Sequence, residues 1–278
     1  MTEKKEKKAK TPKGSKPKKA KKPKMLKNHV VFILDRSGSM ESIRDVTISA
    51  FNEQVQSIKR SSAAEGQQTD VSLFTFSNRP DEPTFFTAPV ESLAELTKET
   101  YRPDGGTALY DTMLEATRRL GNLKDANDPE TAFLVIILSD GEENASHATG
   151  DDVAKRLEAL NETKRWTFTY LGCSAGDLTK IRSMGISASN SRSFVATAAG
   201  VSGTTALNNT ATAQYFSMRS AGITSSDCLY DTAEAVLNSN NPANATGATG
   251  TGTASNKLIL PPGVDPTTDA DTKPPTTT

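Results

Sequence analysis

Short apolar runs along the chain alternate with segments in which apolar side chains recur every three or four positions. Residues 29–34 are almost entirely apolar and predict a buried strand. In residues 43–60, the side chains of Phe51, Val55 and Ile58 share one helical face, which predicts an amphipathic helix. The chain therefore opens with a strand followed by a helix.

The same alternation continues through the middle of the chain. Residues 70–77 alternate apolar and polar side chains, which is typical of a strand with two unequal faces. Residues 131–138 are nearly all apolar, as in a central strand that is covered on both faces. We also expect strands at 84–87, 166–171 and 193–196, and helices at 108–120, 151–161, 177–184 and 204–218. The strand at 84–87 lies between two prolines, which favours an edge position.

Strands that alternate with helices are joined by right-handed crossovers, so that neighbouring strands run parallel. We therefore predict a three-layer α/β fold, in which helices flank a doubly wound, mainly parallel, Rossmann-like sheet. We place this domain at residues 28–221, between two segments of low complexity. Residues 227–237 allow two interpretations, either one more helix packed on the domain or an unanchored segment.

The charges of the chain are balanced in total but are distributed unevenly. The 33 basic and 33 acidic residues include 13 lysines and only two acids within residues 1–27, a local balance of +11. This segment has too few apolar side chains to offset the entropy of ordering, and we expect it to be disordered. We expect residues 222–278 to be mostly disordered for the same reason. The basic segment either contacts nucleic acid or another anionic surface, without sequence preference, or serves only as a solubilising extension.

Cysteine usage and hydropathy bear on the location of the protein. Cys173 and Cys228 are too few for a disulfide framework, and a reduced thiol pair is the simpler interpretation than a single bridge. The lysine-rich beginning has no apolar core of a secretory signal. No run approaches the roughly 18 apolar residues that cross a bilayer. We therefore expect a cytoplasmic protein without a transmembrane segment.

Three polar loops are expected at the edge of the sheet where the parallel strands end. Each follows a predicted strand or precedes a predicted helix: Asp35-Arg36-Ser37-Gly38-Ser39, Asp104-Gly105-Gly106-Thr107 and Ser139-Asp140-Gly141-Glu142-Glu143. Ligands of doubly wound sheets bind at this edge, where the strand order reverses. If the first and fourth strands are neighbours, the hydroxyls and carboxylates of these loops converge, and such hard oxygens suit Mg²⁺, Mn²⁺ or Ca²⁺.

These three segments resemble the metal-ion-dependent adhesion site of von Willebrand factor type A domains. That pattern is Asp-x-Ser-x-Ser, then a Thr after a Gly-Gly turn, then an Asp after a buried strand. Five residues match it in order: Asp35, Ser37, Ser39, Thr107 and Asp140. The sequence around Thr107, from Gly105 to Asp111, is similar to that of intracellular bacterial members of the family. The resemblance covers about residues 28–200.

The resemblance implies a role for each matched residue. Ser37 and Ser39 would bind the cation directly, and Thr107 either directly or through water. Asp35 and Asp140 would hold metal-bound waters and orient the hydroxyls. The cation would keep residual positive charge and an open position, which a carboxylate from a partner protein fills. Arg36 is expected to point outward and could meet the same acidic partner.

Other interpretations of these residues remain open. Thr107 could be a helix N-cap, a role that is compatible with metal binding. Asp35 could be the nucleophile of a metal-dependent hydrolase or phosphotransferase, although Ser37 replaces the second Asp that such phosphatases often carry. We interpret His29 and His147 as structural or solvent-facing, and Glu142 and Glu143 as solvated.

The sequence thus predicts a divalent-metal-dependent protein-binding module that is not an enzyme and has no catalytic residues. By analogy with the family alone, we expect the protein to act as an adaptor in a multiprotein assembly, as some similar proteins do alongside AAA+ ATPases. The alternatives are a hydrolase or phosphotransferase that uses Asp35, and a protein whose basic segment binds nucleic acid or anionic surfaces.

Overall fold

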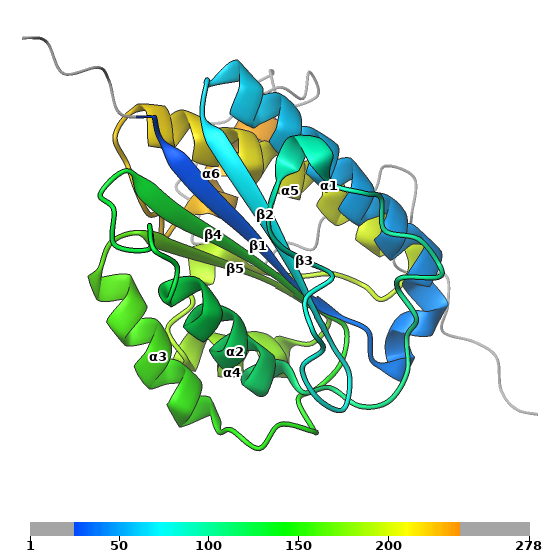
Figure 1. Cartoon of the computed structure of the whole chain (residues 1–278). Helices are drawn as coiled ribbons and strands as arrows, with labels where there is room; N and C mark the ends of the chain where they lie inside the picture. The colour runs from blue at the N-terminus through cyan, green and yellow to red at the C-terminus, as the bar shows by residue number, and fades with distance from the viewer. Residues whose placement is uncertain (1–24, 240–278) are drawn as a thin grey trace, which may run out of the picture.

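The computed structural model describes residues 25–239 and shows a six-stranded sheet between two layers of helices (Figure 1). The strand order is β3-β2-β1-β4-β5-β6, and all neighbours are parallel except β2 and β3. The strands are β1 (Lys27–Asp35), β2 (Gln68–Phe76), β3 (Phe85–Pro89), β4 (Thr131–Ser139), β5 (Trp166–Gly172) and β6 (Ser191–Ser193). The mainly parallel α/β sheet is confirmed, and β3 lies at an edge as its flanking prolines predict.

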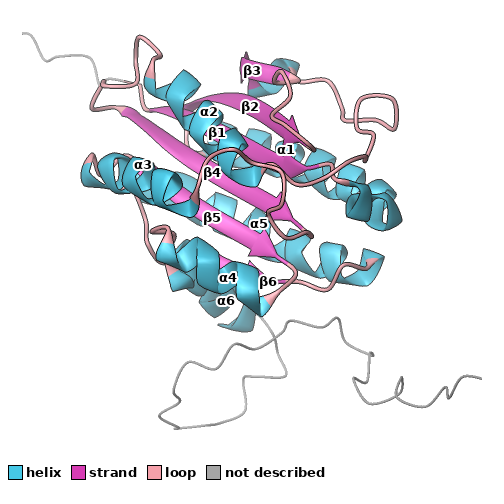
Figure 2. Ribbon diagram, turned by 90° about the horizontal axis from the view of Figure 1, so that it is seen from below, coloured by secondary structure: helices cyan, strands magenta, loops and turns pink. Residues whose placement is uncertain are grey.

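Helices cover both faces of the sheet, as Figure 2 shows. On one face lie α1 (Arg44–Ala64), α5 (Ala198–Ser220) and α6 (Leu229–Ser239), and on the other α2 (Leu109–Gly121), α3 (Gly150–Glu162) and α4 (Ala175–Ser183). Short 3₁₀ helices occupy Gly38–Ile43, Val90–Ser92 and Ala188–Asn190. The two hydrophobic clusters on either side of the sheet share no residue, which is the arrangement of a three-layer fold.

The central strand β1 shows why the apolar runs are continuous rather than alternating. Val30 and Phe32 contribute to the cluster under α1 and α5, whereas Val31 and Ile33 contribute to the cluster under α2 and α3. All four side chains are buried. A parallel strand covered on both faces needs apolar side chains at every position, so the run carries no period of two.

Helix α5 begins at Ala198, six residues before the start expected from its apolar period. Its first turns are rich in Gly, Ser and Thr, which have low helix propensity and carry almost no apolar signal. Thr197 caps this segment by accepting a hydrogen bond from the N–H of Gly200 at 3.1 Å, and Val201 is buried. A cap and one buried side chain extend the helix where propensity does not.

Strand β6 lies at Ser191–Ser193, earlier than the expected 193–196, and has no apolar residue. Its pairing with the end of β5 defines it, from Tyr170 opposite Ser191 to Gly172 opposite Ser193. A short polar edge strand carries no periodic pattern, which is why the sequence misplaced it.

Helix α6 resolves the two interpretations of residues 227–237. Leu229, Tyr230 and Ala233 are buried in the cluster that α1 and α5 form, and Arg192 of β6 pairs with Glu234 at 2.7 Å. The segment is a packed helix, and the folded unit continues past residue 221, where the sequence placed its end. Of the predicted tails at residues 1–27 and 222–278, the parts at 1–24 and 240–278 lie outside the described residues.

Two further expectations concern the thiols and the membrane. Cys173 and Cys228 are both free thiols. Within residues 25–239, none of the helices is long and apolar enough to cross a bilayer.

Candidate metal site

The candidate residues converge at the edge of the sheet where the parallel strands end. Strands β1 and β4 are neighbours, with Leu34 opposite Leu138, so Asp35 and Ser139 come at adjacent strand ends. The chain order reverses between these two strands, which is where doubly wound sheets bind ligands. The convergence expected from the sequence is therefore present.

Asp35 is fully buried at the base of the site, and both of its carboxylate oxygens accept hydrogen bonds. The backbone N–H of Ser37 donates to Oδ1 at 2.7 Å, and the hydroxyl of Ser139 donates to Oδ2. The Tyr101 hydroxyl, also buried, donates to the Asp35 carbonyl. These contacts hold the carboxylate and the start of the loop in one orientation.

A chain of hydroxyls leads from this base to Asp140. The Oγ atoms of Ser37 and Ser39 lie 3.0 Å apart, and Ser39 donates to Oδ1 of Asp140 at 2.6 Å. Ser37 is buried, whereas Ser39 is exposed. The first and third loops are thus joined through side chains of the predicted ligand set.

Thr107 completes the set from the second loop. A methyl group placed on the Cα of Gly141 would lie 3.0 Å from Thr107 Oγ1, 3.5 Å from Ser39 Oγ and 3.7 Å from Ser37 Oγ. The three hydroxyls therefore face one common space beside Gly141, which is kept free because glycine has no side chain.

The hydroxyl of Thr107 has no role as a helix cap. The N-cap of α2 is Ala108, whose own side chain makes no capping hydrogen bond. Among the described residues, the Thr107 hydroxyl takes part in none of the hydrogen bonds, so its oxygen is available as a ligand.

The electrostatics of the site favour a cation from outside the chain. Burial raises the pKa of Asp35 to about 6, although hydrogen bonds from Ser139 and Ser37 act to lower it, and the nearby Asp140 raises it further. Burial also raises the pKa of Asp140. No Lys, Arg or His in the described part of the chain forms a salt bridge with either carboxylate. A divalent cation would favour the ionised form of both groups.

The donor set fits a hard cation rather than a soft one. Three hydroxyls and two carboxylates are all oxygen donors, which suit Mg²⁺, Mn²⁺ or Ca²⁺. Within residues 25–239, no group of three or more His, Cys, Asp or Glu side chains could hold a metal ion, so a cation at this site would depend on the hydroxyl oxygens.

Arg36 does not point toward a partner, contrary to expectation. Its guanidinium donates to Asp81 at 2.5 and 2.7 Å, and also bonds to Asp104 and to the carbonyl of Arg102. Two carboxylates, the half-buried Asp81 and the exposed Asp104, thus pair with one guanidinium within the chain. Arg36 therefore fastens the first loop to the segments on either side of it.

Glu143 is not solvated, which corrects a second expectation. Its carboxylate accepts hydrogen bonds from the N–H groups of Tyr110, Ala145 and Ser146 at 2.8 to 3.0 Å, and from the Ser146 hydroxyl at 2.9 Å. The N–H of Tyr110 belongs to the first turn of α2, where backbone donors lack partners within the helix. Glu143 thus caps α2 from the third loop, whereas Glu142 is exposed.

The two histidines lie away from the metal site, as expected. His29 is buried and stacks on Phe133 with ring centroids 5.1 Å apart. His147 is exposed, and its Nδ1 lies 3.3 Å from Asp111.

The sequence interpretation missed the contacts of four residues with the site: Ser139 and Tyr101 donate to Asp35, and Asn78 and Asn144 accept from the N–H groups of Gly106 and Thr107. Ser139 directly precedes Asp140, so its position at the strand end was readable. The other three lie in loops whose spatial neighbours no local pattern reveals.

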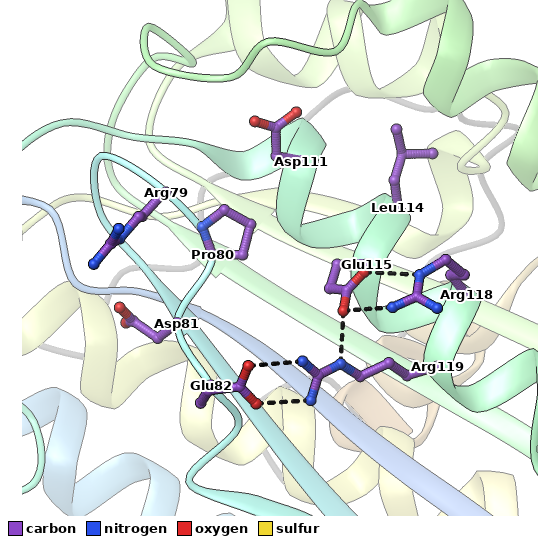
Figure 3. Close-up of a pocket in the computed structure, with 9 residues that line it drawn as sticks. All are labelled: Arg79, Pro80, Asp81, Glu82, Asp111, Leu114, Glu115, Arg118 and Arg119. Carbon is purple, nitrogen blue, oxygen red and sulfur yellow. Dashed lines mark hydrogen bonds and ion pairs between the residues drawn. The ribbon is translucent and has the colours of Figure 1, made fainter.

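A second hollow, of about 440 Å³, lies between the connection from β2 to β3 and helix α2 (Figure 3). In it, Arg119 donates to both oxygens of Glu82 at 2.9 Å and to Glu115 at 2.6 Å, while Arg118 also pairs with Glu115. The lining residues are Arg79, Pro80, Asp81, Glu82, Asp111, Leu114, Glu115, Arg118 and Arg119. None of the five candidate ligands lines this groove, and its carboxylates are largely neutralised by arginines of the same chain.

Comparison with solved structures finds distant similarity. Proximal thread matrix protein 1 from the mussel byssus is 15% identical over 65% of this chain and 44% of its own, with a TM-score of 0.45. A structure of the same protein with a zinc-occupied MIDAS motif is 14% identical over the same shares, with a TM-score of 0.45. A von Willebrand factor type A structure from Catenulispora acidiphila is 15% identical over 71% of this chain and 43% of its own, with a TM-score of 0.42.

These likenesses are too distant to carry an argument about function. The chain spans less than half the length of the solved structures that it resembles. No curated protein matches the sequence. The family model of the von Willebrand factor type A domain, however, matches residues 29–209, which contain most of β1, strands β2 to β6 and all five candidate ligands. The chain therefore belongs to the von Willebrand factor type A domain family.

Proposed function

We propose that this protein is a divalent-metal-dependent protein-binding module and that Asp35, Ser37, Ser39, Thr107 and Asp140 form its metal-ion-dependent adhesion site. The observation that carries the proposal is the common space beside Gly141, which three hydroxyls from separate loops face. Family membership supports the same conclusion, because the matched region includes all five residues.

Each residue has a distinct task at this site. Ser37, Ser39 and Thr107 supply hydroxyl oxygens, while Asp35 and Asp140 orient those hydroxyls and metal-bound water through the hydrogen bonds described above. Mg²⁺ is the proposed ion, because it prefers oxygen ligands and retains several waters, which Asp35 and Asp140 can hold. When bound, the cation supplies a Lewis-acidic position for a carboxylate.

The kind of partner follows from charge. Two carboxylates formally balance the charge of a dication, but both would act through metal-bound water and the hydroxyls rather than as direct ligands. The remaining positive character attracts an anionic oxygen, and an acidic side chain of a partner protein is the simplest source. We therefore propose a partner with an exposed Asp or Glu.

Catalysis by Asp35 is the weaker proposal. A nucleophilic carboxylate needs an oxygen free to attack, whereas both oxygens of Asp35 accept hydrogen bonds from Ser37 and Ser139. These contacts suit a residue that orients a loop. The AAA+ ATPase partner, the contacts of the basic segment and the cytoplasmic location stay predictions.

Calorimetric titration of Mg²⁺ tests the metal site directly. We expect saturable binding by the wild-type chain and none by Ser37→Ala. Ser92→Ala is the matched control, because Ser92 is exposed and its hydroxyl only donates to the Pro89 carbonyl at 3.0 Å. Equal Mg²⁺ affinity of the wild type and Ser37→Ala would contradict the proposed site.

Capture of partners from a lysate of the source organism tests the binding role. Proteins retained by the wild-type chain with Mg²⁺ should be released by EDTA and should not bind to Asp35→Ala. If the same proteins remain bound in both cases, the metal does not bridge the partner. Turnover of a phosphoester panel that Asp35→Asn abolishes would instead favour the hydrolase.

A further inference from the structure

We propose that Asn78 and Asn144 are positioning residues that set the place of Thr107 in the metal site. Neither side chain faces the cluster of hydroxyls as a ligand; both act on the backbone around Thr107. This inference rests on the proposed metal site and identifies which residues outside the ligand set control its affinity.

Asn144 holds the peptide groups on both sides of Thr107. Its Oδ1 accepts from the N–H of Thr107 at 2.9 Å, and its own N–H donates to the carbonyl of Thr107 at 3.1 Å. The N–H of Ala145 donates to the same carbonyl at 3.2 Å. One residue of the third loop therefore fixes the position of Thr107 through both of its backbone polar groups.

Asn78 holds the preceding peptide group. Its Oδ1 accepts from the N–H of Gly106 at 2.7 Å. Asn78 belongs to the loop after β2, and the carbonyl of its neighbour Ser77 accepts from the N–H of Ala108 at 2.7 Å. The amides of residues 106, 107 and 108 are thus all bound by residues outside their own segment.

The glycines before Thr107 make room for these two asparagines. A Cβ on Gly105 would lie 2.5 Å from Asn78 Nδ2, and a Cβ on Gly106 would lie 2.7 Å from Asn144 Oδ1. Gly105 also has a φ of +70°, a conformation that other residues rarely adopt. Glycine is therefore required at both positions of the turn, because the side chains of Asn78 and Asn144 occupy the space that a Cβ would need.

This arrangement couples the loops that supply the ligands. Asn144 lies four residues after Asp140 in the third loop, and Gly38 of the first loop donates to the Gly105 carbonyl at 3.0 Å. The Thr107 hydroxyl therefore keeps its register with Ser37, Ser39 and Asp140 only while these contacts persist. Residues that orient metal ligands in this way typically change metal affinity by about 10- to 100-fold.

A double-mutant cycle on Mg²⁺ affinity tests the inference. We expect Asn144→Leu to weaken Mg²⁺ binding at least about tenfold, since leucine keeps the size but removes the acceptor. Because Asn144 acts through Thr107, the double variant Thr107→Ala/Asn144→Leu should bind no more weakly than Thr107→Ala alone. If the two substitutions weaken Mg²⁺ binding by factors that multiply in the double variant, or if Asn144→Leu binds Mg²⁺ as wild type does, the positioning role of Asn144 is overturned.

Two more variants separate positioning from general damage to the fold. Asn144→Asp keeps the acceptor and should restore Mg²⁺ binding to within a few-fold of wild type. Asn161→Leu is the matched control, because the Asn161 amide donates to the Gly185 carbonyl at 3.3 Å, outside the site. It should leave the affinity unchanged. If Asn144→Leu does not fold, the same cycle with Asn78→Leu decides the question, with Asn78→Asp as its rescue.

The cycle also separates this inference from the proposed function. If Thr107→Ala weakens Mg²⁺ binding but Asn144→Leu and Asn78→Leu do not, the metal site stands and the positioning role is wrong. If Thr107→Ala and Ser37→Ala both bind as wild type, the metal site itself is wrong and the positioning role is refuted with it.

Discussion

The two ends of the parallel strands, which form opposite edges of the sheet, hold charged side chains in opposite arrangements. At the edge where the parallel strands begin, Lys27 pairs with Asp70 at 3.1 Å and with Asp125 at 2.6 Å. At the edge where they end, Asp35 and Asp140 have no cationic partner among the described residues. Burial acts to raise the pKa of both Asp125 and Asp35, but the bond to Lys27 leaves the pKa of Asp125 lowered, whereas that of Asp35 rises to about 6.

This difference distinguishes a structural edge from the edge that holds the proposed metal site, which we call the functional edge. The first edge is complete within the chain: buried Arg219 donates to Asn28 at 2.8 Å and to the Glu130 carbonyl at 2.6 Å. At the second edge, two carboxylates and three hydroxyls form the proposed cation site. Contacts within the chain stabilise the first edge, whereas the second edge would gain stability only when a cation binds.

The largest expected effect lies at the structural edge. Arg219→Ala should lower the free energy of unfolding by about 3 to 4 kcal/mol, because it removes the hydrogen bonds that a buried guanidinium donates to Asn28 and Glu130 and opens a cavity. Urea denaturation with and without Mg²⁺ measures the loss, which should be the same in both. A loss that Mg²⁺ reverses would show that the two edges are not independent.

Asp35→Asn is expected to raise the free energy of unfolding of the metal-free protein, the opposite of the effect of Arg219→Ala. A carboxyl whose pKa is raised in the folded state from 3.8 to about 6 makes stability fall as the pH rises through that window. The corresponding cost above pH 6 is about 3 kcal/mol. Asp35→Asn should therefore be more stable than wild type at pH 8 by about 1 to 3 kcal/mol and similar at pH 3.5.

The matched variant at the other edge is Asp125→Asn. The ion pair lowers the pKa of Asp125, so its stabilisation is present above the unfolded pKa and is lost as the pH falls. This variant should be less stable than wild type at pH 7. The same sign of change at both edges would refute the contrast.

Mg²⁺ itself should stabilise the protein through the functional edge alone. At a free concentration 100 times the dissociation constant, binding to the folded state adds about 2.7 kcal/mol to the free energy of unfolding. Thermal unfolding in Mg²⁺ and in EDTA measures this difference. Ser37→Ala should lose the response, whereas Arg219→Ala should keep it.

The smallest effect is expected for Glu143→Ala. Its carboxylate caps the first turn of α2 and orders the third loop, so its loss should reduce stability by about 1.5 kcal/mol. Chemical denaturation measures this change. Glu142→Ala is the control, because Glu142 is exposed, and it should have no comparable effect.

Strong local patterns predicted the correct elements. The apolar runs of β1 and β4 determined two central strands, because a parallel strand covered on both faces must be apolar throughout. Elements without such a pattern were misplaced: the polar β6 and the Gly- and Thr-rich start of α5 depend on pairing and capping. The apolar face of α6 was visible, but whether it packed was not.

The candidate ligands themselves could be identified from their residue types and order, since a hard-cation site needs hydroxyls and carboxylates at strand ends. Their surroundings could not. Arg36 and Glu143 look solvent-exposed in the sequence, yet each is bound by residues distant in the chain. Asn78 and Asn144 lie in loops that no short-range pattern relates to Thr107.

The sequence by itself thus determined the α/β fold, the family and the five oxygen-bearing residues, because hydrophobic period and motif are local properties. Tertiary structure alone decided that three hydroxyls face the space beside Gly141, that Arg36 is paired within the chain and that two asparagines grip the Thr107 backbone. The physical reason is that hydrogen bonds and ion pairs depend on the distances between loops, which follow from the order of the strands.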